Sequence, residues 1–154
     1  MGVSNEKRCK TSCELHNTTH KAKLNDIQTD TFQYPVRHTA KRNIRYSSSK
    51  HSLQDEHKIL LHLSGNLVPI YDDGKIGFTQ AQMYLLTYNN EYVNILNSKL
   101  YKFVFTICKW SGFNIEKLYH NIPFITERCT DDELYIRFNL SAEEIAVVNR
   151  TSKN

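Results

Sequence analysis

The spacing of the apolar residues changes once between positions 58 and 108, and this change constrains the fold more than any other feature. Residues 58–63 and 82–88 are short runs rich in aliphatic and aromatic side chains, which is typical of strands. From Glu91 onward the apolar residues recur every three or four positions, which predicts one helix over residues 91–108, ended by Ser111-Gly112. We therefore predict an α+β fold with a small, mostly antiparallel twisted sheet, one long packed helix and short C-terminal helices.

The remaining elements are predicted from local signals. Residues 32–36 form a short edge strand because Pro35 lacks the N–H group that an inner strand needs. Residues 37–46 are compatible with a basic β-ribbon or a loop, and extended structure resumes over residues 67–71. The sequence Asp72-Asp73-Gly74-Lys75 predicts a hairpin turn, since Asp-Gly readily supplies a positive φ.

The C-terminal part contains three helix signals. Residues 114–121 form a short helix that ends before Pro123. The pairs Thr130/Glu133 and Ser141/Glu144 match the capping box, and the second begins a last helix that extends to about residue 150.

Large aliphatic residues are scarce before position 58, so we predict one globular domain over residues 32–150. Residues 1–31 are predicted to be a polar, disordered arm, and residues 151–154 a tail. No apolar run is long enough to span a membrane and no signal-peptide core follows Met1, which predicts an intracellular protein that is not secreted. The four cysteines are too few and too scattered for a secreted disulfide scaffold.

The charge is distributed unevenly along the chain. Residues 1–58 contain 11 Lys and Arg against 6 Asp and Glu, a net +5, whereas residues 59–154 contain 9 against 10, a net −1. A basic N-terminal third points to an anionic partner such as nucleic acid, although a solvated tail would have the same composition.

Several kinds of catalytic chemistry lack their motifs. The three prolines are never adjacent, so the Asn/Asp-Pro-Pro-aromatic loop of an adenine methyltransferase is missing, and the five glycines match no nucleotide-binding spacing. The ligand types Cys9, Cys13, His16 and His20 are spaced wrongly for a zinc finger, which makes a chance cluster the better interpretation. Asp55, Asp73 and Lys75 weakly suggest a Mg²⁺-dependent nuclease, but Asp-Asp-Gly-Lys is also an ordinary turn.

Nucleic-acid recognition, in contrast, has all its residue types. Cations bind phosphates, amides bind base edges, and aromatic rings stack on or wedge between bases. Each candidate also has a structural interpretation: Trp110 and Phe113 as lids on the core, and Tyr71, Tyr84 and Tyr88 as strand packing. The candidate DNA-binding residues are Arg37, Lys41, Arg42, Arg45, Asn66, Lys75, Gln80, Lys102, Lys109, Trp110, Phe113 and Asn114.

Residues 32–150 contain a series of motifs that together resemble one family. The clearest are Leu96-Asn97-Ser98-Lys99-Leu100 followed by Ser111-Gly112-Phe113, and weaker ones are Tyr34-Pro35-Val36-Arg37, Tyr71-Asp72-Asp73-Gly74-Lys75 and Leu140-Ser141-Ala142-Glu143-Glu144. The chain thereby resembles the C-terminal specificity (target-recognition) domain of TaqI-like type II and type IIG adenine-N6 DNA methyltransferases of restriction–modification systems, including copies in large DNA viruses.

The resemblance implies sequence-specific binding of double-stranded DNA. It also implies a methyltransferase catalytic subunit as a possible partner, since the catalytic domain and its S-adenosylmethionine would lie outside this chain. Such a module would work in the cytoplasm, a nucleoid or a viral factory. Arg37, Lys41, Arg42, Lys102 and Lys109 would contact phosphates, and Asn66, Lys75, Gln80 and Asn114 would contact base edges.

Two other functions remain open from the sequence. In one, the chain is a non-catalytic interaction domain that docks a partner on the apolar helix at residues 91–108. In the other, it is a small Mg²⁺-dependent nuclease built on Asp55, Asp73 and Lys75.

Overall fold

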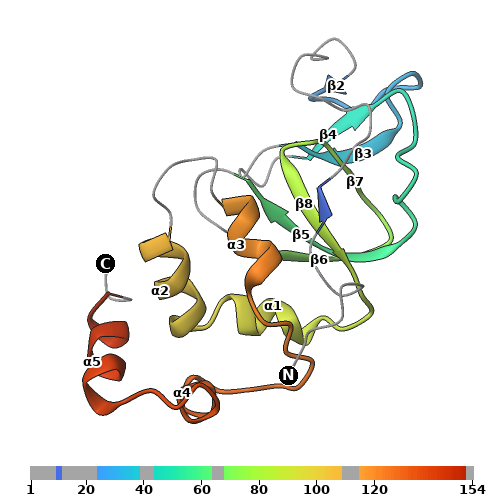
Figure 1. Cartoon of the computed structure of the whole chain (residues 1–154). Coiled ribbons are helices and arrows are strands. Elements are labelled where there is room, and N and C mark those ends of the chain that lie inside the picture. Colours follow the sequence, from blue (N-terminus) through green and yellow to red (C-terminus); the bar gives the residue numbers. More distant parts are fainter. Residues whose placement is uncertain (1–9, 12–23, 39–43, 64–67, 109–114, 152–154) are drawn as a thin grey trace.

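The computed structural model describes residues 10–11, 24–38, 44–63, 68–108 and 115–151 (Figure 1). In these ranges the strands are β1 Lys10–Thr11, β2 Leu24–Asn25, β3 Tyr34–Arg37, β4 Ile44–Ser47, β5 His57–His62, β6 Ile70–Asp73, β7 Gly77–Phe78 and β8 Gln82–Leu86. The helices are α1 Glu91–Leu96, α2 Lys99–Cys108, α3 Ile115–Asn121, α4 Asp131–Arg137 and α5 Ala142–Thr151. The α+β class is confirmed, and none of these helices is long and apolar enough to span a membrane.

The described strands form two sheets, whereas the sequence predicted one. The first sheet has the order β1-β8-β5-β6 and is antiparallel throughout. The second has the order β2-β4-β3-β7, in which only the β3–β7 pair is parallel. Figure 1 shows both sheets in the upper right of the molecule and the helices toward the lower left. The basic segment before residue 58 thus forms most of a sheet of its own.

The turn at Asp72–Lys75 is where the chain passes from one sheet to the other. Gly74 has the expected positive φ, 88°, and a Cβ there would lie 2.5 Å from the carbonyl oxygen of Asp55, so this close approach requires glycine. The predicted hairpin is nevertheless wrong, because β6 pairs with β5 and β7 pairs with β3. A turn motif specifies the local backbone, but the pairing of the flanking strands depends on distant residues.

One further prediction about a strand is corrected. β3 lies between β4 and β7, so it is not an edge strand, but β7 pairs only with Val36 and Arg37 and its register stops short of Pro35. Within the arm predicted to be disordered, β1 pairs with β8 and β2 pairs with β4. Strands of two residues are too short to produce an alternating pattern, so they leave no signal in the sequence.

The single helix predicted over residues 91–108 consists of two helices, α1 and α2, separated by Asn97 and Ser98. The side-chain oxygen of Ser98 accepts a hydrogen bond from the Tyr101 N–H at 3.3 Å, and Asp131 accepts one from the Lys99 N–H at 2.8 Å. Because these acceptors satisfy N–H groups at the start of α2, the break between α1 and α2 costs little free energy. The helical spacing continues across it because both helices bury apolar residues in one core.

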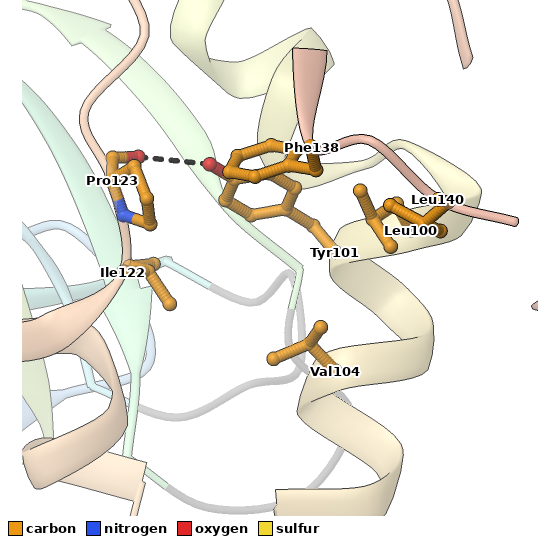
Figure 2. A pocket seen from close by; sticks show the side chains of 7 residues that line it. All are labelled: Leu100, Tyr101, Val104, Ile122, Pro123, Phe138 and Leu140. Atoms are coloured by element: carbon orange, nitrogen blue, oxygen red, sulfur yellow. Dashed lines mark hydrogen bonds between the residues drawn. The ribbon is translucent and has the colours of Figure 1, made fainter. Parts of the chain in front are cut away.

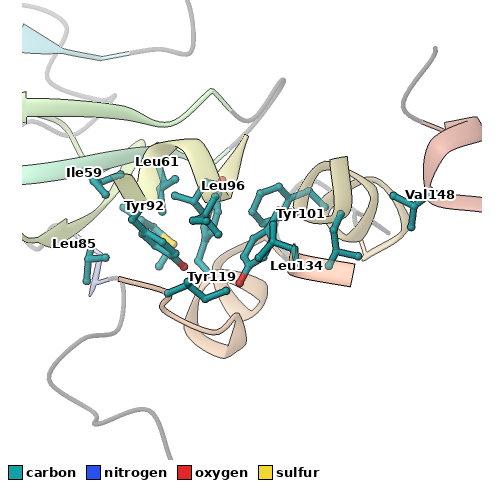
Figure 3. Close-up of a cluster of buried hydrophobic side chains, with 14 of the residues drawn as sticks. Ile59, Leu61, Leu85, Tyr92, Leu96, Tyr101, Tyr119, Leu134 and Val148 are labelled. Atoms are coloured by element: carbon teal, nitrogen blue, oxygen red, sulfur yellow. The ribbon is translucent and has the colours of Figure 1, made fainter. Parts of the chain in front are cut away.

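That core fills the space between the first sheet and the helices (Figure 3). Ile59 and Leu61 of β5 contribute from the sheet, and Tyr92, Tyr101 and Tyr119 contribute from α1, α2 and α3. β5 lies between β8 and β6, and Ile59, Leu60 and Leu61 are each at most 1% exposed. The prediction of a central strand at residues 58–63 is therefore confirmed.

Both predicted capping boxes form at the starts of α4 and α5. Glu133 accepts a hydrogen bond from the Thr130 N–H at 2.7 Å and donates its own N–H to the Thr130 hydroxyl oxygen at 3.3 Å. Ser141 and Glu144 repeat this exchange at 2.7 and 3.3 Å. The predicted helices over 114–121 and up to about residue 150 correspond to α3 and α5.

Candidate nucleic-acid interface

Arg37 joins the two sheets and is unavailable to a phosphate in this fold. Its side chain is 4% exposed, and its guanidinium donates hydrogen bonds to the carbonyl oxygens of Leu60 at 3.3 Å and Val68 at 3.0 Å. Burial lowers the pKa of Arg37. The predicted phosphate contact is therefore corrected: Val36 and Arg37 are both buried, so β3 is covered on both faces at this end, and a buried arginine cannot be distinguished from a surface one by sequence.

Residues that flank several of the loops lie close together, near the end of β5 marked by His62. The Nδ1 atom of His38, just after β3, lies 3.1 Å from the hydroxyl of Thr79, and the Leu63 N–H donates to the Ala81 carbonyl oxygen at 3.0 Å. Gln82, which begins β8, is paired with His62 at the end of β5. We call this region, formed by His38, Leu63 and residues 79–82, the loop end.

Gln80 is exposed at the loop end, as a residue that reads base edges must be. The hydroxyl of Tyr119 in α3 donates to the His62 carbonyl oxygen at 3.5 Å, which ties α3 to the same end of β5. Along the chain, residues 39–43 follow His38, residues 64–67 follow Leu63, and residues 109–114 precede α3. Seven candidates lie in these three segments, outside the described residues: Lys41, Arg42, Asn66, Lys109, Trp110, Phe113 and Asn114.

A buried polar layer lies beneath the loop end and was not singled out from the sequence. Thr79 and Gln82 are fully buried, and the Gln82 amide donates to the His38 carbonyl oxygen at 3.4 Å. The Oε1 atom of Gln82 is buried, and no described residue donates a hydrogen bond to it. Gln82 begins β8, and Thr79 and His38 directly follow β7 and β3, positions at which sequence reasoning assigns a polar side chain to the solvent side.

The other described candidates do not form one surface with Gln80. Arg45 lies on β4, where its guanidinium forms an ion pair with Asp26 at 2.7 Å, and Lys102 is exposed on α2. Lys75 lies near His57, at the other end of β5, and pairs with Asp73 at 2.8 Å. Because a strand rises about 3.3 Å per residue, roughly 17 Å separates the two ends of β5. The structure therefore does not bring Lys75 together with Gln80.

Each of the two carboxylates of the nuclease hypothesis forms an ion pair with a lysine. Asp55 pairs with Lys50, and Asp73 accepts a hydrogen bond from Lys75, which lowers the pKa of Asp73 and raises that of Lys75. Within the described ranges, no group of three His, Cys, Asp or Glu side chains is arranged to hold a metal ion. The possible zinc ligands Cys9, Cys13, His16 and His20 lie outside those ranges.

An apolar groove lies among the helices, away from the loop end (Figure 2). It has a volume of about 220 Å³, and Tyr101 crosses it to donate a hydrogen bond to the Pro123 carbonyl oxygen at 2.9 Å. Its lining is wholly apolar in the exposed atoms and comes from Leu100, Tyr101, Val104, Ile122, Pro123, Phe138 and Leu140. Much of the apolar face of α2 that was predicted to dock a partner is buried in the chain's own core, and the groove is an open apolar hollow beside it.

Of the three tyrosines predicted to pack on strands, Tyr88 is different. Tyr84 packs beside Phe78, with ring centroids 5.1 Å apart, and Tyr71 is half-buried. Tyr88 is 79% exposed and contacts the ring of His57 at a centroid distance of 4.5 Å. The strand prediction over residues 82–88 extended two residues too far, which is why this side chain was assigned to packing.

Comparisons of the chain with protein-family models, with curated proteins and with solved structures found no match.

Proposed function

We propose that this chain is a sequence-specific DNA-recognition module that serves an adenine-N6 DNA methyltransferase of a restriction–modification system as its specificity domain. The observation that carries the proposal is the antiparallel β3–β4 ribbon, in which Arg37 pairs with Ile44 and the connecting residues include Lys41 and Arg42. β3 and β4 are the inner strands of a four-stranded sheet, so in this proposal their connecting residues, and not the strands, enter the DNA major groove, which is about 12 Å wide. The family resemblance over residues 32–150 and the +5 charge of residues 1–58 support the same function.

In this proposal the loop end faces the DNA. Lys41, Arg42 and Lys109 contact phosphates, and Asn66, Gln80 and Asn114 are the candidates for base edges. Trp110 and Phe113 buttress or wedge the bases. Methylation, with its S-adenosylmethionine, is carried out by a separate catalytic subunit.

The first test is the binding of the purified chain to a pool of random DNA duplexes over a salt series, followed by sequencing of the bound fraction. A recognition module enriches one short motif, and the enrichment persists at physiological salt. Binding without enrichment that disappears with added salt leaves only a basic arm. No binding at low salt contradicts the proposal.

Charge-removing variants then test the proposed face. Arg42→Ala and Lys109→Ala are each expected to weaken binding to all sequences alike and to reduce the log–log salt slope by about 0.9. Lys75→Ala is the matched control, since it removes one exposed cation at the other end of β5. If all three variants behave alike, the loop end is the wrong face.

The apolar groove supports a second candidate function, a non-catalytic interaction domain. A partner held in a groove lined only by apolar atoms binds with little dependence on salt, unlike DNA. Phe138→Ala, at 38% exposure, removes part of the groove with limited effect on the core. Loss of a partner in this variant, with DNA binding absent from the parent chain, favours this function over the first.

A further inference from the structure

We infer that Tyr88 and His57 form a stacking platform for an unpaired nucleobase, at the opposite end of β5 from the loop end. The two rings are 4.5 Å apart between centroids and tilted by 33°, close to an offset stack. Tyr88 keeps 79% of its surface exposed despite this contact, so the ring face turned away from His57 is open to solvent. An exposed aromatic face is the contact that a base makes with proteins that bind single strands.

The platform is held in place before any ligand binds. The Nδ1 atom of His57 and the hydroxyl oxygen of Tyr71 lie 2.6 Å apart, a hydrogen bond whichever of the two carries the proton. The Tyr71 hydroxyl also lies 3.5 Å from the Tyr88 carbonyl oxygen, and the Thr87 N–H donates to the His57 carbonyl oxygen at 3.1 Å. Because these bonds restrict the His57 ring and the Tyr88 backbone, stacking has a smaller entropic cost.

The charges around the platform favour a neutral planar ligand over a cluster of phosphates. Lys75 pairs with Asp73, Lys50 pairs with Asp55, and the two turns touch where Gly74 meets the backbone of Asp55. Each of these two lysines is thus neutralised by a carboxylate. We therefore expect the platform to bind its ligand by stacking, with little dependence of affinity on salt. That the planar ligand is a nucleobase rests on the proposed function.

The platform is tested with a fluorescently labelled ten-residue oligothymidine and, separately, its duplex with oligoadenosine, by anisotropy with the full chain at low and physiological salt. Since stacking contributes about 1–3 kcal/mol per base, Tyr88→Ala is expected to weaken single-strand binding about 5- to 150-fold and to leave duplex binding within about twofold. Tyr88→Phe keeps the ring and is expected to bind within about twofold of the parent.

Ile136→Ala is the matched control, because Ile136 belongs to a different element, α4, and is equally exposed, at 79%. Unchanged single-strand binding by Tyr88→Ala overturns the inference, as does an equal loss for single strand and duplex. Binding of an oligoarginine peptide that depends on Tyr88, with no binding of the single strand, also overturns it and assigns the ring to a cation.

The outcomes separate this inference from the proposed function. Duplex binding without binding of the single strand contradicts the inferred platform and leaves the proposed function in place. Single-strand binding that requires Tyr88, with no duplex binding, supports the platform and contradicts the duplex-recognition function.

Discussion

The two faces of the first sheet are buried by different chemistry. On the helix-covered face, Ile59 and Leu61 pack against α1–α4 in an apolar cluster. On the face toward the second sheet, the alternate β5 residues Lys58, Leu60 and His62 are equally buried, and two of these three are polar. Lys58 donates to Asp72 and to the carbonyl oxygens of Gln54 and Glu56. One face is stable because it excludes water from apolar surface, and the other because each buried charge has specific partners.

This difference predicts which substitutions lower the free energy of unfolding most. An apolar core tolerates small rearrangements, because its contacts are numerous and non-directional. A buried ion pair fails as a unit, since the partner that remains is a buried charge without compensation. Four changes test this contrast, in order of decreasing expected effect.

The largest effect is expected from Lys58→Met, which leaves Asp72 buried at 5% exposure without its cation. The free energy of unfolding, measured by urea denaturation, should fall by about 3–5 kcal/mol. Asp72 keeps its hydrogen bonds from the N–H groups of Lys75 and Ile76. The double variant Lys58→Met with Asp72→Asn should therefore lose less than the sum of the two single changes, and strict additivity would show that the pair is not coupled.

A smaller or comparable effect is expected from Leu61→Ala on the helix-covered face. Leu61 is 1% exposed, so its truncation removes buried methyl groups and leaves a cavity. The same denaturation should give a loss of about 2–5 kcal/mol, and Leu61→Met should cost less than about 1.5 kcal/mol because volume is conserved. Equal losses in the two variants would contradict close packing at this position.

Arg37→Met tests whether this arginine joins the sheets or contacts DNA. It removes two hydrogen bonds from a buried charged donor while keeping the aliphatic stem, and the expected loss of stability is about 1–3 kcal/mol. Under conditions where the variant is folded, the salt slope of DNA binding should equal that of the parent chain. A slope reduced by about 0.9 would return Arg37 to the phosphate-binding set.

The smallest effect is expected at the α4 cap. Thr130→Ala removes a capping acceptor and should cost about 1 kcal/mol. Hydrogen bonds from the Thr130 N–H and hydroxyl lower the pKa of Glu133 in the folded state. Its contribution is therefore present above the unfolded pKa of about 4.3 and is lost as the pH falls through the folded value. Glu133→Gln should flatten this acidic dependence, which thermal unfolding over a pH series would measure.

The sequence by itself determined the local elements. Helical spacing located α1 and α2, the Thr130/Glu133 and Ser141/Glu144 pairs marked the starts of α4 and α5, and Gly74 marked a turn. Each signal lies within a few residues of the structure that it predicts, because periodicity, caps and turns depend on neighbouring backbone groups. The Asn97–Ser98 break was missed because burial on both sides preserves the helical spacing.

Only the tertiary structure decided which strands pair and which polar residues are buried. β6 and β7 are joined by one turn and belong to different sheets, and two-residue strands complete both sheets from the N-terminal arm. Arg37 and Lys58 are interior while Tyr88 is exposed, against the usual preference of each side chain. Pairing and burial depend on residues far apart in the chain, so the loop end and the aromatic platform became visible only once the two sheets were placed together.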